Sequence, residues 1–183
     1  MEENTPSTPE FQGGNLWKAS GFPHRGWVCI RVVDLNPDES PADEVDYETC
    51  QVCNHHPIRF VHTIAHAGWP DQLDVGRICA EHLTQDYVNP RKNEDRLRKI
   101  SGARSRWLKR RWRNSAKGAF WLKVRGHHIT VFLCQCGCEQ WRCCFDGEFG
   151  TLYHPSKEAA MMSAFNKLVH EEAKEAMERA RLS

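Results

Sequence analysis

The chain has no uninterrupted apolar run of about 20 residues, the length that a membrane-spanning helix needs. Its first residues, MEENTPSTPEFQGG, lack the basic-then-apolar order of a secretory signal, and no internal repeat occurs along the chain. These absences argue against membrane, secreted and repeat proteins, so we expect a cytoplasmic protein. Its 183 residues, 40% hydrophobic and 27% charged, suffice for one ordinary domain or two small ones.

Cysteine, in contrast, is abundant, with nine in the chain. Cytoplasmic proteins rarely form disulfides, so we expect these cysteines to be metal ligands or free thiols. Two pairs have the spacing of metal ligands: Cys50 and Cys53 in CQVC, and Cys79 and His82 in CAEH. Because Cys₃His is a common tetrahedral zinc site, the sequence predicts one Zn²⁺ bound by these four residues. His55 or His56 is an alternative ligand, and a set of buried thiols with a surface histidine is the alternative to a metal site.

The first half of the chain is expected to hold an arm and a zinc-binding module. Residues 1–25 are rich in Pro, Ser, Gly and Asn, which is typical of a mobile arm. The module is expected over residues 26–88. Within it the pattern predicts a strand over 26–35, an acidic loop over 35–48, a strand over 58–66 with a turn at 67–72, and a short helix over 75–88.

The second half is expected to hold a basic helix and a small domain of sheet and helix. Asn89 and Pro90 are typical of a helix start, and residues 89–117 are expected to form one long helix. Its apolar stripe consists of Leu97, Ile100, Ala103, Trp107 and Leu108. Residues 118–183 predict three or four antiparallel strands packed by a C-terminal helix that starts at Pro155 and Ser156. Two alternating runs over 119–133 join near Gly126, and residues 140–153 predict a hairpin with Asp146-Gly147 at its turn. The expected fold class is therefore α+β.

The order of motifs between residues 50 and 85 is a C-x-x-C knuckle, a β-hairpin and a ligand-bearing helix. This order resembles the treble-clef family of zinc fingers, which implies a structural zinc ion that joins the knuckle to the helix. A wider set of motifs is similar to uncharacterised bacterial and phage proteins: Arg25-Gly26-Trp27, Ile58 to His62, Val75 to Cys79, Trp107 to Arg113 and Ser115 to Gly118. No activity is assigned to that group, so this resemblance implies organisation and not function.

The charge of the chain is strongly segregated although its net value is only +1. Residues 1–60 carry 4 basic and 10 acidic side chains, whereas residues 91–125 carry 14 basic and 2 acidic ones. Phosphates would relieve the repulsion within such a helix, and arginine suits bidentate phosphate contact. We expect non-enzymatic, phosphate-driven binding of DNA or RNA through Arg98, Lys99, Arg104, Arg106, Lys109, Arg110, Arg111, Arg113 and Lys117. The alternatives are docking on the acidic loop of the same chain, or on an acidic protein partner as an adaptor or inhibitor.

A nuclease of the HNH type is a second alternative, because these enzymes are treble clefs as well. His62 lies on the predicted hairpin, and Asp74 lies five residues before Cys79. However, Val61 and Leu83 occupy the positions where that family has an acidic residue and a last histidine. A catalytic metal ion would have too few ligands there to activate water, so we expect no catalytic residue.

A second group of cysteines lies in the stretch CQCGCEQWRCC, residues 134–144. Its members are Cys134, Cys136, Cys138, Cys143 and Cys144. A second zinc site or a redox-sensitive thiol patch is one interpretation. Small apolar residues at the end of a hairpin are the interpretation that we favour.

Overall fold

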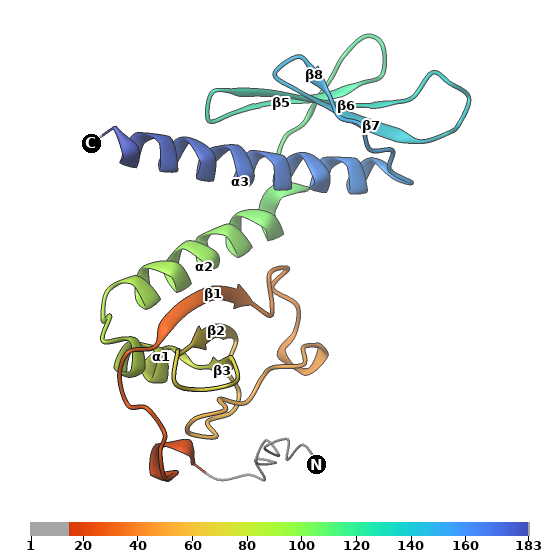
Figure 1. The fold of residues 1–183 in the computed structure, drawn as a ribbon. Helices are drawn as coiled ribbons and strands as arrows, with labels where there is room; N and C mark the ends of the chain where they lie inside the picture. The colour runs from red at the N-terminus through yellow and green to blue at the C-terminus, as the bar shows by residue number, and fades with distance from the viewer. Residues whose placement is uncertain (1–14, 183) are drawn as a thin grey trace, which may run out of the picture. The chain divides into compact units, whose positions relative to one another are not determined.

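The computed structural model describes residues 15–182. They form an α+β protein with three α-helices and two antiparallel sheets, as expected from the sequence (Figure 1). The chain divides into two compact units, Met1–Lys99 and Ile100–Ser183. Each unit has its own hydrophobic core, so each is described by itself.

The first unit is built on a three-stranded sheet in the order β1-β2-β3. Its elements are η1 (Leu16–Lys18), β1 (Val28–Asp34), η2 (Ala42–Glu44), β2 (Phe60–Ala65), β3 (Leu73–Val75) and α1 (Arg77–Thr84). β2 pairs antiparallel with both neighbours, which confirms the expected hairpin. The predicted helix over 75–88 is shorter than expected, because Val75 belongs to β3 and Gln85 ends α1 in the left-handed conformation at φ 57°.

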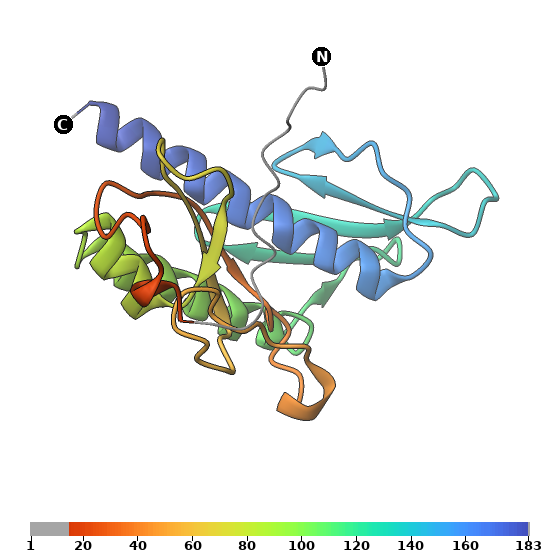
Figure 2. The ribbon, with the colours of Figure 1, turned by 60° about the horizontal axis from the view of Figure 1, so that its bottom comes forward.

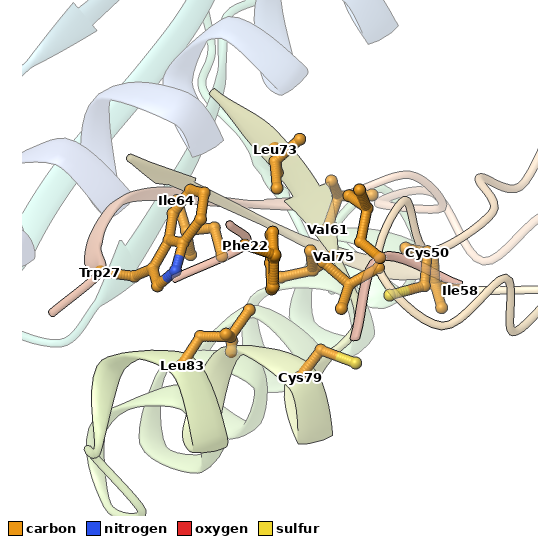
Figure 3. Packing of buried hydrophobic residues seen from close by; sticks show 13 residues of the cluster. Phe22, Trp27, Cys50, Ile58, Val61, Ile64, Leu73, Val75, Cys79 and Leu83 are labelled. Atoms are coloured by element: carbon orange, nitrogen blue, oxygen red, sulfur yellow. The ribbon is translucent and has the colours of Figure 1, made fainter. Parts of the chain in front are cut away.

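The core of the first unit joins the sheet, α1 and the segment that precedes β1 (Figure 3). Ile64 on β2 and Leu83 on α1 are fully buried at its centre. Leu16 and Phe22 pack into the same core and are only 3% and 4% exposed. The expectation of a mobile arm is therefore wrong for residues 15–25, because these two apolar side chains anchor the segment. Residues 1–14 of that arm lie outside the described residues.

The helix α2 spans Asn89–Trp107, so the expected basic helix ends ten residues early and residues 108–117 are not helical. Trp107 is 1% exposed, its Nε1 donates to the Met161 carbonyl at 2.7 Å, and its ring meets Trp112 edge-on at 5.7 Å. Packing of both indoles in the second unit requires the chain to turn after Trp107. Leu108, expected on the apolar stripe, is consequently 41% exposed.

The second unit is a five-stranded antiparallel sheet in chain order, with a helix on one side (Figures 1 and 2). Its elements are β4 (Arg113–Asn114), β5 (Phe120–Val124), β6 (His127–Leu133), β7 (Trp141–Phe145), β8 (Glu148–Phe149) and α3 (Lys157–Arg181). The expectation of three or four strands is corrected to five. β4 and β8 contain two residues each, which is too short to produce an alternating pattern in the sequence.

In the second unit a hairpin turn and a helix cap form at the residues where the sequence predicts them. Asp146 and Gly147 connect β7 to β8 with φ values of 51° and 90°, the left-handed pair that a two-residue hairpin turn needs. The Ser156 side chain accepts the backbone N–H of Ala159 at 3.1 Å and so caps α3. The predicted hairpin and helix start are both confirmed.

Candidate metal centre

Three cysteines of the first unit come together at one point. The Sγ atoms of Cys50, Cys53 and Cys79 all lie within 4.8 Å of one another. Cys50 and Cys79 are buried and Cys53 is partly buried. Figure 3 shows the Cys79 side chain reaching from α1 toward Cys50. Three thiols at this separation form a donor set for a soft or borderline cation such as Zn²⁺.

A tight turn presents the first two thiols. The backbone N–H of Asn54 donates to the Cys50 carbonyl at 2.8 Å, and that of Cys50 donates to the His55 carbonyl at 2.9 Å. Asn54 adopts the left-handed conformation at φ 59°, which asparagine tolerates better than most residues. The turn therefore folds the CQVC stretch back on itself and directs both thiols to one side.

The third thiol comes from the first turn of α1. Gly76 caps this helix, and a Cβ atom placed on it would lie 3.1 Å from Cγ2 of Ile58. This contact is tighter than nine in ten real Cβ contacts, so with a larger residue the Ile58 side chain or the helix would have to move by a few tenths of an ångström. Glycine at this position lets α1 approach closely enough for Cys79 to join the other two thiols.

The environment favours a thiolate at Cys50. A hydrogen bond with Cys79 is the main cause that lowers the pKa of Cys50 to about 5, against the opposing effect of burial. Backbone groups of Cys53, Gly76 and Val52 lower the pKa further. The same hydrogen bond and burial raise the pKa of Cys79. Because metals bind the thiolate, a lowered pKa within this group of thiols favours metal binding.

The fourth predicted ligand, His82, is not part of the group of three sulfurs. It lies on α1 one turn after Cys79, is exposed, and its Nδ1 atom lies 3.4 Å from the Tyr87 hydroxyl. His82 nevertheless lines a cavity of about 530 Å³ together with the three cysteines and His55. Because they share this cavity with the sulfurs, His82 and His55 are the candidates for a fourth ligand. His56 instead contacts Thr49 and the Glu48 carbonyl.

A network of arginines and buried carboxylates, not anticipated from the sequence, reaches the same cavity through Arg77 and Glu94, which line it. Glu81 is 4% exposed and accepts from Arg77 at 2.9 Å and from Arg91 at 3.0 Å. Burial raises the pKa of Glu81, but the hydrogen bonds from Arg91 and Arg77 outweigh it and lower the pKa overall. Only the four-residue spacing of Arg77 and Glu81 in the sequence could have indicated part of this network.

His62 and Asp74, the two residues that were compared with the HNH nuclease motif, both contact other side chains of the first unit. His62 is fully buried, and its Nε2 atom lies 3.1 Å from Glu94 Oε1. Asp74 accepts the Thr63 hydroxyl at 2.6 Å across the β2–β3 pair. These contacts hold β2 to α2 and to β3; His62 is removed from the surface, whereas Asp74 is partly exposed.

The second cysteine group is smaller than expected. Cys134, Cys136 and Cys138 have their Sγ atoms within 4.8 Å of one another between β6 and β7, and Cys136 and Cys138 form a disulfide. Gly137 at φ 76° bends the chain between the two residues. The three sulfurs lie close enough together to hold a metal ion, so a second zinc site stays a prediction. Cys143 and Cys144 lie outside the group, on β7.

The nine predicted nucleic-acid ligands do not form one helical stripe. Arg98 and Lys99 lie on α2 before the division of the units, and Arg104 and Arg106 lie on its last turn. Arg98 packs 4.8 Å from the Phe60 ring and Arg104 donates to Asn166 at 2.9 Å. The remaining five lie beyond the end of α2: Lys109, Arg110, Arg111, Arg113 and Lys117.

Comparison with protein-family models, curated proteins and solved structures gave no match to this chain. None of the described helices combines the length and apolar character needed to span a membrane. Function must therefore be inferred from the residues themselves.

Proposed function

We propose that the protein is a non-enzymatic nucleic-acid-binding protein whose first unit is stabilised by a structural Zn²⁺. The observation that carries the proposal is the basic segment of residues 99–117, which has many exposed cations and no acidic residue. No Asp or Glu occurs from residue 96 to residue 138. The exposed cations within or next to the end of α2 are Lys99, Arg106, Lys109, Arg110, Arg111, Arg113 and Lys117.

Such a segment is unfavourable by itself, because like charges repel at this density. Phosphates of DNA or RNA relieve the repulsion and release bound counterions, which makes binding salt-dependent. Arginine predominates, and its planar guanidinium can contact a phosphate through two hydrogen bonds.

Zinc fits the residues of the metal centre. We infer a treble-clef arrangement in which Cys50 and Cys53 form the knuckle, β2 and β3 the hairpin, and Cys79 the ligand on α1. His82 or His55 completes the set of four, since both line the same cavity. Four protein ligands leave no open position for a substrate, so the zinc would hold elements together and not take part in a reaction.

The nuclease alternative has no observation in its favour, because His62 contacts Glu94 on α2 and Asp74 accepts a hydrogen bond from Thr63 across the β2–β3 pair. An acidic protein partner would use the same exposed cations. The experiment below separates a protein partner from nucleic acid.

The test is fluorescence anisotropy of the zinc-loaded protein with labelled duplex DNA, duplex RNA and single strands over a salt series. We expect the logarithm of the affinity to fall linearly with the logarithm of salt concentration. Reversing three charges, in Arg106→Glu, Lys109→Glu and Arg110→Glu, should weaken binding by about tenfold or more and reduce the salt slope by about two to three.

The matched control reverses three exposed cations of α3, in Lys174→Glu, Arg179→Glu and Arg181→Glu, which changes net charge equally. It should retain most of the affinity. Equal losses in both triple variants would mean that net charge and not this segment drives binding. Absence of binding to every nucleic acid at low salt would overturn the proposal and favour an acidic protein partner.

A further inference from the structure

The two faces of the five-stranded sheet differ in chemistry. One face contributes apolar side chains to the core beneath α3, among them Val124, Ile129 and Phe145. Residues that are directly paired across strands point to the same side of a sheet. The register pairs Arg113 with Trp121, Lys123 with His128, and Phe132 with Arg142.

We call the second side the aromatic–basic face. It consists of the strand residues that alternate with the core positions: Arg113, Trp121, Lys123, His128, Thr130, Phe132, Arg142, Cys144 and Phe149. Every one of them is exposed or partly exposed. The set contains three cations, one histidine and three aromatic rings, and no carboxylate.

At one end of this face a cation and two rings lie next to one another. The Arg113 guanidinium lies 5.0 Å from the centre of the Trp121 ring, and that ring lies 5.6 Å from the His128 ring at 31°. A cleft of about 670 Å³ adjoins Trp121 and is also lined by Arg111, Arg113 and Lys123. A flat indole beside a concave, cationic surface can receive a planar base and its phosphate.

The other end repeats the combination of ring and cation. Phe132 meets Phe149 edge-on at 5.8 Å, and Phe149 is 65% exposed. Arg142 lies 5.0 Å from the Tyr153 ring and donates to the Gly150 carbonyl at 2.7 Å, which holds its guanidinium beside these rings. Stacking surfaces are thus present across several strands and not at one position.

We propose that the aromatic–basic face binds single-stranded nucleic acid, with bases stacked on Trp121 and Phe149 and phosphates bound by Arg113, Lys123 and Arg142. The proposal rests on the proposed nucleic-acid binding and specifies its strand form and its surface. Bases of a duplex are stacked on one another, so exposed rings on a sheet can engage only unpaired bases. A second copy of the chain is a poor occupant, because two such faces would bring cations against cations without a carboxylate between them.

The test compares Trp121→Ala with Trp121→Phe, which keeps a stacking ring, in binding to labelled oligothymidine, oligouridine and a duplex of matched length. We expect Trp121→Ala to weaken single-strand binding by about tenfold and Trp121→Phe to retain most of it. Duplex binding should stay close to wild type in both. Lys123→Glu should weaken single-strand binding more than Lys174→Glu, an exposed position on α3 with the same charge change.

Equal single-strand affinity in wild type and Trp121→Ala would overturn the proposal. If single-strand binding were unchanged in Trp121→Ala but fell when the charges of Arg106, Lys109 and Arg110 were reversed, the proposed function would stand. Only the assignment of binding to the aromatic–basic face would then be wrong. A concentration-dependent dimer that Trp121→Ala abolishes would likewise overturn it, because the face would then join two copies. Circular dichroism of each variant checks that the fold is retained.

Discussion

At the scale of single residues, the hairpin turn at Asp146 illustrates how a short polar contact fixes local structure. Its Oδ2 atom lies 2.7 Å from His127 Nδ1, and its Oδ1 atom accepts the backbone N–H of His128 at 2.6 Å. The hydrogen bond to His127, followed by that to His128, lowers the pKa of Asp146 below its ordinary value of 3.8. The folded protein therefore favours the ionised carboxylate.

This depressed pKa sets the sign of a pH dependence. The contribution of Asp146 to stability is present above its ordinary pKa and is lost as the pH falls through the lower pKa of the folded state. We expect Asp146→Asn to lower the unfolding temperature at about pH 7, and the difference from wild type to disappear toward about pH 2. Thermal unfolding of both proteins across this range measures it. A deficit that stays constant on acidification would contradict a role for the charge, and Glu178→Gln on α3 is the control for net charge.

At the scale of elements, the end of α2 depends on one buried side chain. Trp107 contacts the Phe165 ring at 5.3 Å and donates a hydrogen bond to the Met161 carbonyl on α3. The next residue, Leu108, is largely exposed although the helical periodicity placed it on the same stripe. The helix therefore ends where tertiary packing of the indole demands a change of direction.

Trp107 and Leu108 are adjacent in the chain but differ in burial, so substituting each by alanine gives a matched comparison. Trp107→Ala should lower the free energy of unfolding of the second unit by about 3–5 kcal/mol, because it leaves a large cavity and removes a buried hydrogen bond. Leu108→Ala should change it by no more than about 0.5 kcal/mol, as is usual for exposed positions. Urea denaturation, monitored by hydrogen exchange of α3 and β6, measures the free energy of unfolding of both variants. Similar losses in the two variants would show that the helix continues beyond Trp107.

At the scale of the whole molecule, the two units have separate cores, and the candidate metal centre belongs to the first. Zinc binding contributes about 10–16 kcal/mol in small zinc fingers, which is comparable with the total stability of a small domain, about 5–15 kcal/mol. Loss of zinc should therefore unfold the first unit and leave the second folded.

Hydrogen exchange of the reduced protein before and after chelation is the measurement. Protection should be lost in β1, β2, β3 and α1 and retained in β5, β6, β7 and α3. Cys79→Ser should reproduce the loss without a chelator, whereas Cys29→Ser, which replaces a cysteine of β1 outside the sulfur group, should not. Equal loss of protection in both units, or none in either, would argue against a zinc-dependent first unit.

The sequence alone determined the features that depend on neighbouring residues. Alternation predicted β1, β2, β5 and β6, the Asp146-Gly147 pair predicted a hairpin, and Ser156 predicted the start of α3. The spacing of Cys50, Cys53 and Cys79 likewise identified the three thiols that the structure brings together. In each case turn chemistry, capping or strand alternation acts within a few residues, so the information is present in a short stretch.

Only the tertiary structure decided what depends on contacts between distant segments. The burial of Leu16 and Phe22 and the end of α2 at Trp107 arise from partners far along the chain. The position of His82 outside the sulfur group arises in the same way, whereas the gathering of Arg113, Trp121 and His128 on one sheet face depends on the register of successive strands. A short stretch of sequence does not predict these contacts, because burial and cross-strand register are set only when separate segments pack together.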